Sequence, residues 1–319
     1  MFQKINIKKS FFDLILIKNI VLEPILFIEK KEKKGESHSM AKHNSVFLYA
    51  LVAKNPKIYK NVNTGEYVTG YCPVIIIRGN RESGFDGVSD IRYDTPIIMT
   101  GNEAIIRQME EWKENDIVEI KGVITTKNVT KKAVCPYCGN VKRIEGCTFT
   151  FITPIFTELR KTGISKEEGI QMLKEHIEIS NQVSLLGYLV TEPDYYRTQY
   201  GVDITQYPIA VNRKYRIKDD EPSIKTDYPW IKSFNVIARK DAQLLKKSAL
   251  VFIDGMIQTR EITRKTFCDS CEDNFEFPDS AVEIVSYSTE YLNGCRTPEE
   301  LEKMAEMKAK QVEDEIFSE

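Results

Sequence analysis

The sequence predicts a mainly β protein that contains two tandem copies of one small barrel. Three observations lead to this fold class: an internal repeat, two matching C-x-x-C motifs, and short strand-like segments that recur in the same order in both halves. The chain has 319 residues, which at about 150 residues per domain corresponds to roughly two domains. Its composition, 42% hydrophobic and 29% charged, is typical of soluble globular proteins and excludes collagen-like, coiled-coil and wholly disordered classes.

The repeat is clear in two ungapped segments. Residues 44–56 (NSVFLYALVAKNP) match residues 181–193 (NQVSLLGYLVTEP) at an offset of 137, and residues 122–138 match residues 255–271 at an offset of 133. The second copy is therefore four residues shorter between its first strand and its glycine, and we expect this shortening in its helix. The resulting divisions are an N-terminal extension (1–39), a first domain (40–160), a helical linker (161–180), a second domain (181–295) and an acidic helical tail (296–319).

Each copy is predicted to contain three strands, a helix and two further strands. The first strands are rich in β-branched and aromatic residues, and Thr64-Gly65 and Tyr200-Gly201 form turn signals before the second strands. The helix of copy one has apolar residues at helical spacing, and each fourth strand contains a glycine that permits a bend or a bulge. The expected strands are 46–53, 67–77, 91–100, 117–124 and 148–153 in copy one, and 183–191, 203–211, 230–238, 250–257 and 281–286 in copy two, with helices at 103–112 and 241–246. This order is that of a five-stranded OB-fold barrel, a fold whose open face and loops bind oligonucleotides.

Copy two also contains segments that resemble bacterial single-stranded DNA-binding proteins. They are Asn181-Gln-Val-Ser-Leu-Leu-Gly-Tyr-Leu, Ile209-Ala-Val-Asn-Arg213, Phe234-Asn-Val-Ile-Ala-Arg-Lys-Asp-Ala242 and Val251-Phe-Ile-Asp-Gly-Met-Ile-Gln-Thr-Arg260. These segments look like that family's first strand, the end of its second strand, its third strand entering the helix, and its fourth strand. In copy one, Val74-Ile-Ile-Ile-Arg78 replaces the Val-Asn-Arg pattern. The resemblance implies sequence-independent binding of single-stranded DNA in replication, recombination or repair, by a chain that supplies two binding modules.

Binding single strands without sequence preference needs cations for the phosphates and flat aromatic faces for the bases. Trp230, Lys232 and Phe234 alternate along one predicted strand and should share one of its faces. The cluster from Arg213 to Lys218 is expected to contact phosphates, while some of the aromatic side chains are expected to pack in the core instead. The candidate nucleic-acid-binding residues are Tyr59, Lys60, Tyr67, Arg78, Arg81 and Tyr93 in copy one, and Tyr195, Tyr196, Arg197, Tyr200, Arg213, Lys214, Tyr215, Arg216, Lys218, Trp230, Lys232 and Phe234 in copy two.

The two C-x-x-C motifs occupy equivalent positions, at the tips of the hairpins between the fourth and fifth strands. The two-residue spacer lets both thiolates reach one metal ion, and Gly139 permits a tight turn after the first motif. A tetrahedral zinc site needs four ligands, so one option is a single Zn²⁺ ion shared by both hairpins. The candidate metal ligands are Cys135, Cys138, Cys268 and Cys271. The alternatives are Cys147 as a third ligand within copy one, a redox-active disulfide, and thiols that bind no metal.

The N-terminal extension holds 8 basic and 5 acidic residues around an apolar stretch. Charged residues and Pro24 interrupt that stretch below the length needed to span a bilayer, and no small-residue cleavage site follows it. Either the segment is an extension of the folded protein or translation begins at Met40. We place no function there and expect a cytoplasmic protein without a membrane partner.

The C-terminal tail holds 4 basic and 8 acidic residues. Its segment Glu313-Asp-Glu-Ile-Phe317 resembles the acidic tip with which members of the family dock partner enzymes. The resemblance therefore implies replication or recombination enzymes as partners of the tail. A homo-oligomer is a further option, because most family members form tetramers. The formal net charge of −2 includes this acidic tail, so it does not exclude a nucleic-acid partner.

Catalytic motifs are missing from the sequence. It contains no P-loop, no nucleophile elbow and no H-E-x-x-H motif. A C-x-x-C oxidoreductase would need a thioredoxin-like βαβ context, which the strand order does not provide. We therefore expect a binding protein rather than an enzyme. The competing hypothesis is an OB-fold interaction scaffold or a subunit of a primosome or DNA-transfer complex.

Overall fold

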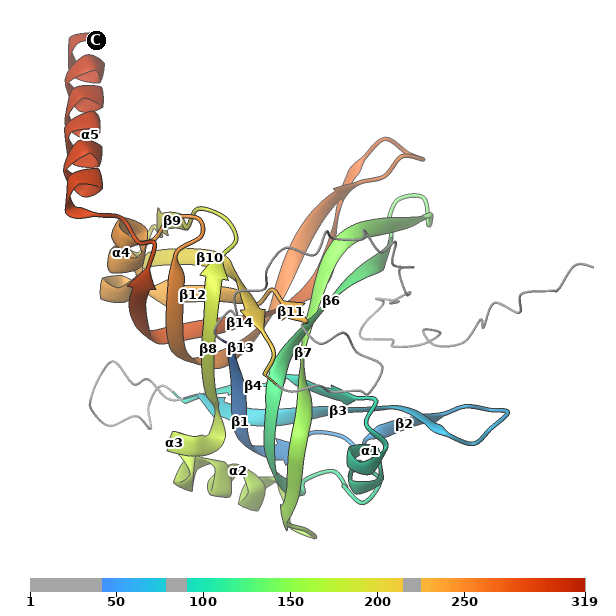
Figure 1. Ribbon diagram of the computed structural model, residues 1–319. Coiled ribbons are helices and arrows are strands. Elements are labelled where there is room, and N and C mark those ends of the chain that lie inside the picture. Colours follow the sequence, from blue (N-terminus) through green and yellow to red (C-terminus); the bar gives the residue numbers. More distant parts are fainter. Residues whose placement is uncertain (1–41, 79–90, 215–224, 319) are drawn as a thin grey trace, which may run out of the picture. The chain divides into compact units, whose positions relative to one another are not determined.

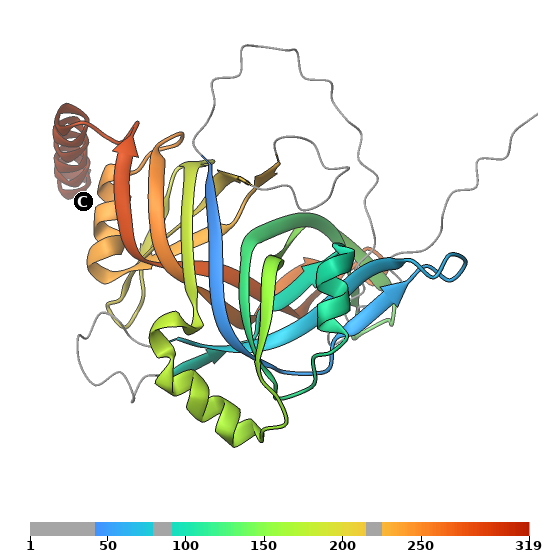
Figure 2. The same cartoon turned by 60° about the horizontal axis from the view of Figure 1, so that its bottom comes forward.

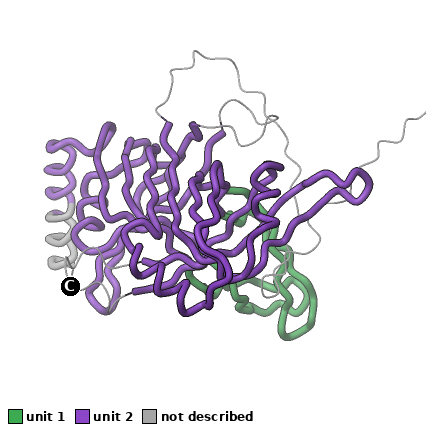
Figure 3. Tube along the Cα trace, turned by 90° about the horizontal axis from the view of Figure 1, so that it is seen from below, with its two compact units in different colours: residues 1–38, 126–150, 260–281 green, residues 39–125, 151–259, 282–319 purple. Residues whose placement is uncertain are grey.

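The computed structural model describes residues 42–78, 91–214 and 225–318 (Figure 1). They form two compact units, which Figure 3 shows in different colours. Residues 126–150 and 260–281 belong to one unit, which we name the arms, and the other described residues belong to the second, which we name the barrels. None of the described helices is both long and apolar enough to cross a membrane.

Five strands close the first barrel in the predicted OB-fold order. The elements of copy one are β1 (His43–Val52), β2 (Lys57–Lys60), β3 (Tyr67–Arg78), β4 (Arg92–Asp94), β5 (Ile97–Thr100), α1 (Glu103–Met109), β6 (Ile117–Val134) and β7 (Val141–Lys161). Strand β1 pairs with both β6 and β3, β3 pairs with β5, β5 with β7, and β7 with β6, so the sheet returns to its first strand. The pairing of β5 with β7 is parallel.

The second barrel repeats this arrangement. Its elements are β8 (Gln182–Leu189), β9 (Asp194–Arg197), β10 (Asp203–Asn212), β11 (Thr226–Asp227), β12 (Trp230–Phe234), α4 (Asn235–Leu244), β13 (Leu250–Phe267) and β14 (Asn274–Asn293). Strand β8 pairs with β13 and β10, β10 with β12, β12 with β14 in parallel, and β14 with β13. The prediction of two tandem five-stranded OB-fold barrels is confirmed.

A buried asparagine explains why each copy opens with the same residue. Asn44 donates to the carbonyl oxygen of Ile124 (2.9 Å) and accepts from its N–H (2.8 Å). Asn181 makes the same two bonds to Ile257, each 2.8 Å long. The amide side chain thereby satisfies a backbone donor and acceptor that would otherwise be buried without partners, which is costly.

The two barrels are joined by antiparallel pairing of β1 with β8 (Figure 2). Val46 pairs with Val183, its own equivalent in the repeat at the offset of 137, while Ser45 pairs with Ser184 and Phe47 with Gln182. Because the pairs on either side of Val46 and Val183 exchange equivalent positions, a local two-fold axis relates the copies at this point. The pairing makes the barrels one continuous sheet.

The glycine in each fourth strand allows close approach of the fifth strand rather than a bulge. A Cβ atom added at Gly122 would lie 2.5 Å from the carbonyl oxygen of Thr153, and one at Gly255 would lie 2.5 Å from that of Val285. Only a residue without a side chain fits at this distance. Close packing against the fifth strand therefore requires glycine at this position in both copies.

The expectation that copy two has a shorter helix is wrong. Helix α4 has 10 residues and α1 has 7. The paired residues show where the chain is shorter: the offset is 137 in β1 and β8, 135 at Pro73 and Pro208, and 133 at Ile97 and Trp230, which pair with those prolines. Two residues are lost before the second strand ends, and two more between that strand and the third strand.

Several boundaries also differ from the expected ones. The third strand of copy two ends at Phe234 instead of residue 238, and α4 begins at once because its buried residues Ala238 and Asp241 pack on the barrel. The fourth and fifth strands of each copy extend far beyond the expected ranges, since the cysteine hairpins are β-structure up to their tips.

The predicted linker forms α2 (Lys166–Glu175) and α3 (Ile177–Ser180). Ser165 and Glu168 form a capping box at the start of α2. Leu173 packs with Tyr49 and Leu51 of β1, so the helices cover the outer face of the first barrel. The tail forms α5 (Pro298–Ser318), which confirms a helix there and extends it.

Candidate functional site

Exposed aromatic side chains lie on strands β9 and β12 of the second barrel and in the turn after β9. All four residues of β9 are exposed, including Tyr195, Tyr196 and Arg197. Tyr200, in the turn that follows, is 85% exposed. Trp230 begins β12, opposite Pro208 of β10, and is 43% exposed. These side chains present flat faces to solvent on one barrel.

The face predicted for the third strand is only partly available. Trp230, Lys232 and Phe234 alternate along β12 as expected. Lys232, however, is buried, and its Nζ atom lies 3.5 Å from the carboxylate of Glu283 on β14. Trp230 is therefore the member of this set with the largest solvent-exposed surface.

Two of the predicted nucleic-acid-binding arginines form ion pairs within the chain, one buried and one half-buried. Arg213 is 4% exposed, and its Nε and Nη2 atoms donate to the Asp227 carboxylate at 2.5 and 2.8 Å. Arg78 donates through Nε to Asp94 at 2.9 Å. Arg213 matches Arg78 at the offset of 135, and Asp227 matches Asp94 at 133, so the pair belongs to the repeated skeleton. We leave both arginines out of the proposed binding surface.

Lys214 is exposed. The predicted residues Arg81, Tyr215, Arg216 and Lys218 lie outside the described residues.

In copy one, the predicted residues of the first hairpin contact each other. Tyr67 donates to the carboxylate of Glu110 at 2.5 Å, and Lys60 forms an ion pair with the same residue at 2.9 Å. These hydrogen bonds, first that from Tyr67, lower the pKa of Glu110. The cations of Lys60 and Arg107 lie over the Tyr67 ring, 4.2 and 4.8 Å from its centroid. This ring is thus occupied by contacts within the chain.

Of the other two candidates in copy one, Tyr59 is half-buried and Tyr93 is exposed.

Sequence reasoning missed Asp203 and Arg239, which form a hydrogen-bonded group with Tyr195 in copy two. Tyr195 donates to Asp203 at 2.7 Å, and Arg239 of α4 donates to the same carboxylate. Arg239 lies in one of the segments that carry the family resemblance, but no pattern in the sequence links it to a residue 36 positions earlier.

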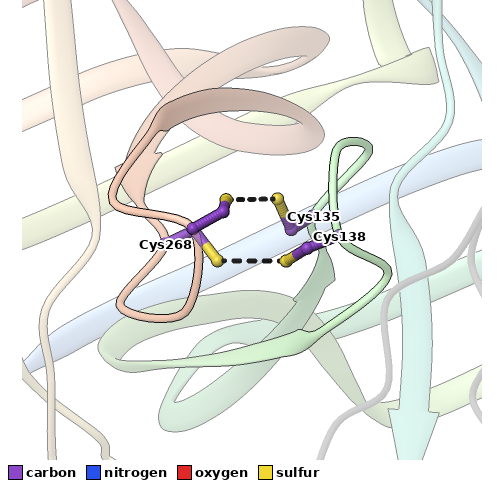
Figure 4. Close-up of side chains that lie close together, drawn as sticks. Cys135, Cys138 and Cys268 are labelled. Atoms are coloured by element: carbon purple, nitrogen blue, oxygen red, sulfur yellow. Dashed lines mark hydrogen bonds between the residues drawn. The ribbon is translucent and has the colours of Figure 1, made fainter.

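All four candidate metal ligands meet within the arms (Figure 4). The Sγ atom of Cys135 lies 3.6 Å from that of Cys271, and Cys138 lies 3.6 Å from Cys268. All four sulfurs lie within 4.8 Å of one another. A tetrahedron with Zn–S bonds of about 2.3 Å has edges of about 3.8 Å. The separations therefore fit four thiolates around one metal ion, and the four cysteines can hold one.

The two C-x-x-C turns have the same backbone geometry. The N–H of Cys135 donates to Asn140 and that of Cys268 to Asp273, each at 2.9 Å. The residue after each motif is left-handed: Gly139, as predicted, at φ +73°, and Glu272 at φ +57°. The positive φ is easy for glycine and costs about 1 kcal/mol or more for glutamate.

The thiols in the second turn differ in acidity. Backbone hydrogen bonds from Cys271 and Ser270 lower the pKa of the Cys268 thiol to about 6, whereas burial raises the pKa of Cys271 to about 12. Of the two thiols in this turn, Cys268 is therefore the better prepared to bind as a thiolate at neutral pH.

Side chains from both hairpins hold the arms together around the sulfurs. Ala133 and Cys135 of one hairpin pack with Phe275 and Phe277 of the other. Lys131 forms a buried ion pair with Asp279, and Lys142 pairs with Asp269 at 2.5 Å. Cys147, considered as a third ligand within copy one, instead contacts the carbonyl oxygen of Ile144 at 3.7 Å and lies outside the cluster.

Comparisons with known proteins place the sequence in a family. Residues 180–270 match the model of the Single-strand binding protein family. Over 80 residues the chain is 35% identical to Single-stranded DNA-binding protein B of Bacillus subtilis, an alignment that covers 25% of this chain and 69% of that protein. The chain belongs to the single-strand binding protein family. Single-stranded DNA-binding protein 2 of Listeria monocytogenes is 30% identical over 112 residues, which are 35% of this chain and 63% of that relative.

A solved structure shares the fold of this single-strand binding family member. The crystal structure of the wild-type single-stranded DNA binding protein from Thermus aquaticus superposes with a TM-score of 0.51 at 13% sequence identity, covering 81% of this chain and 96% of that one. Because 81% of the chain exceeds the length of either copy, the shared fold includes both barrels. At this identity the comparison shows the fold alone.

Proposed function

We infer that the protein binds single-stranded DNA without sequence preference, and that the second barrel supplies the main contacts. The observation that carries this proposal is the exposed Trp230 beside the tyrosines of β9, inside the region that matches the family. Stacking of a base on an aromatic side chain contributes roughly 1–3 kcal/mol. The chain spans 63–69% of the relatives named above, so their activity is extended to this chain as a proposal.

The chain offers an internal probe for the test. It has two tryptophans, of which Trp112 is 3% exposed and Trp230 is 43% exposed. Titration with oligothymidine should quench the Trp230 fluorescence, and affinity should fall as salt rises because bound counterions are released. Equal affinity for duplex and single strand, or no binding to either, would contradict the proposal.

The biological role that fits this binding is coating of single strands during replication, recombination or repair. The second candidate is a scaffold or subunit of a primosome or DNA-transfer complex, which the acidic helix α5 favours. Alanine at Tyr195 and Tyr196 separates the two: only the first role predicts a large loss of DNA affinity. The proposed activity is binding, with no catalytic step.

We also propose that Zn²⁺ is the metal held by the four cysteines, in a structural role. Four thiolates at tetrahedral separations are the ligand set that structural zinc sites use. The bound ion would tie the hairpin of one copy to that of the other. Elemental analysis should find about one zinc per chain, retained in Cys147→Ser and lost in Cys135→Ser. Less than roughly half a zinc per chain would contradict the assignment.

The tail is proposed to recruit replication or recombination enzymes. Its net negative charge and helical form support docking on a basic surface. Removing residues 313–319 should abolish co-purification of such enzymes and leave DNA affinity unchanged. Assembly into homo-oligomers stays a prediction, which analytical ultracentrifugation tests.

A further inference from the structure

The carboxylate of Asp203 contacts side chains from two other elements of the second barrel, β9 and α4. Asp203 begins β10, and its side chain is 4% exposed. The hydroxyl of Tyr195 on β9 donates to Oδ1 at 2.7 Å, and Nη1 of Arg239 on α4 donates to Oδ2. Nε of Arg197 lies 3.7 Å from Oδ1 and donates to the carbonyl oxygen of Gly201 at 3.2 Å.

The groups held by this carboxylate remain open to solvent. The side chains of Arg197 and Arg239 are 66% and 51% exposed, although both lie against Asp203. Each guanidinium has five N–H donors, and the hydrogen bonds above use only one on each, so further donors are available to a ligand. The Tyr195 ring is also exposed, while its hydroxyl is fixed by Asp203. The aromatic face is therefore oriented before any ligand arrives.

The charges in this cluster suit one phosphodiester. Hydrogen bonds, first from Tyr195 and then from Arg239, lower the pKa of Asp203, so its carboxylate is ionised at neutral pH. Two guanidinium cations and one carboxylate leave a single positive charge. A phosphodiester carries one negative charge, and a guanidinium can bind it with two N–H groups.

Copy one has no counterpart of Asp203 or Arg239. At the offset of 135, Asp203 corresponds to Val68, and at 133 Arg239 corresponds to Ile106, which is buried. In copy one, Tyr67 instead donates to Glu110, and the cations of Lys60 and Arg107 lie over its ring. The Tyr195 ring of copy two is 43% exposed, and this difference favours a ligand in copy two.

We propose that Asp203 anchors a preformed subsite for one nucleotide of a single strand. The Tyr195 ring takes the base, Arg197 and Arg239 take the phosphate, and Asp203 is a positioning residue that fixes all three before DNA binds. The subsite rests on the proposed single-stranded DNA binding and assigns it residues and a division of roles. Pre-orientation of this kind raises affinity because less side-chain entropy is lost on binding.

The deciding variant is Tyr195→Phe, which keeps the ring and removes the anchoring hydroxyl. Titration of the full chain with oligothymidine should show about a fivefold loss of affinity, the order of magnitude of one ordinary hydrogen bond. The control is Tyr188→Phe, on β8 of the same barrel, which should bind as the wild type does. A subsite that depends on stacking alone predicts no change for either variant, and that result would overturn the anchor.

Two further variants test the phosphate side. Arg239→Gln should weaken binding about tenfold and reduce the slope of log affinity against log salt by about 0.7, the value for one phosphate contact on a single strand. Asp203→Asn should also weaken binding, because the guanidiniums lose their fixed positions. Tighter binding by Asp203→Asn would mean that the carboxylate only neutralises the arginines, and it would overturn the positioning role.

Trp230→Ala separates this subsite from the wider function. If the wild type binds and Trp230→Ala weakens binding while Tyr195→Phe, Arg239→Gln and Asp203→Asn all match the wild type, the subsite is wrong and the function stands. If the wild-type chain binds no oligothymidine, both are overturned. Thermal unfolding of each variant, measured by circular dichroism, confirms that the compared chains are folded.

Discussion

The two copies share several buried polar contacts and differ in their surfaces. Both keep the asparagine that bonds to the fourth strand, the glycine against the fifth strand, and the arginine–aspartate pair at the end of the second strand. On the surface, helices α2 and α3 cover the outer face of the first barrel around Tyr49 and Leu51. The equivalent residues of the second barrel, Leu186 and Tyr188, remain partly exposed.

The difference between the copies distinguishes residues that stabilise the barrel from residues that are proposed to bind DNA. A residue found in both copies and buried in both serves the barrel, whatever its charge suggests. The aromatic and basic groups proposed to bind DNA are concentrated where copy two departs from copy one: Trp230 stands where copy one has Ile97, and Arg239 stands where it has Ile106. The four cysteines are the place where both copies contribute to one site.

Removal of the metal should have the largest effect, and it tests the four-cysteine site to which both copies contribute. Zinc bound by cysteines contributes on the order of 10 kcal/mol to the folding of small domains. A chelator should therefore release amide protection in residues 126–150 and 260–281, while the barrels keep theirs. Hydrogen exchange read by mass spectrometry measures both regions in one experiment. Unchanged exchange in the arms after the zinc is gone would show that the apolar core and ion pairs suffice.

The next effect concerns the shared ion pair. Arg213→Gln leaves the buried Asp227 carboxylate without its guanidinium and should lower the free energy of unfolding by about 3–5 kcal/mol. Arg78→Gln should cost less, about 1–2 kcal/mol, because Arg78 is partly exposed and water can replace some of its contacts. Urea denaturation measures both. If Arg213→Gln weakens DNA binding and leaves stability intact, the residue belongs to the binding surface after all.

A smaller effect distinguishes the copies in binding. Trp230→Ala should weaken the binding of oligothymidine by about 1–3 kcal/mol through loss of base stacking. Ile97→Ala, at the equivalent position of copy one, should change DNA affinity by less than about 0.5 kcal/mol. Fluorescence anisotropy with a labelled oligonucleotide compares the two. Equal losses would mean that both barrels bind DNA through this strand.

The smallest effect lies in the C-x-x-C turns. Glu272→Gly should relieve the left-handed strain and tighten metal binding by up to about 1 kcal/mol, whereas Gly139→Ala should weaken it by a similar amount. Competition with a zinc chelator measures both affinities. Loss of affinity in both variants would show that the Glu272 side chain has a role of its own.

The sequence was sufficient for the fold because the repeat and the strand-like composition are local signals. It could not assign Arg213, since the Asp227 that neutralises it comes 14 residues later in the sequence, and only the structure shows that the two side chains meet. The repeat has an arginine and an aspartate at these positions in both copies, but alignment alone does not show that they pair. The start of α4 was missed because Phe234-Asn-Val-Ile is strand-like, while the backbone turns at Asn235 with φ +51°.

The sequence predicts the cysteine cluster only in part. The spacing C-x-x-C indicated half a metal site in each copy, and a site shared by Cys135, Cys138, Cys268 and Cys271 was one option among several. The sequence could not choose among them because it does not show which loops meet. The structure brings the four sulfurs together within one unit.

The proposal that the second barrel supplies the main DNA contacts is tested most directly by hydrogen exchange of the whole chain, measured with and without saturating oligothymidine. We expect new protection in residues 194–212 and 230–234 of the second barrel, and little change where α2 and α3 cover the first. Protection confined to the first barrel, or none in either barrel, would contradict the account.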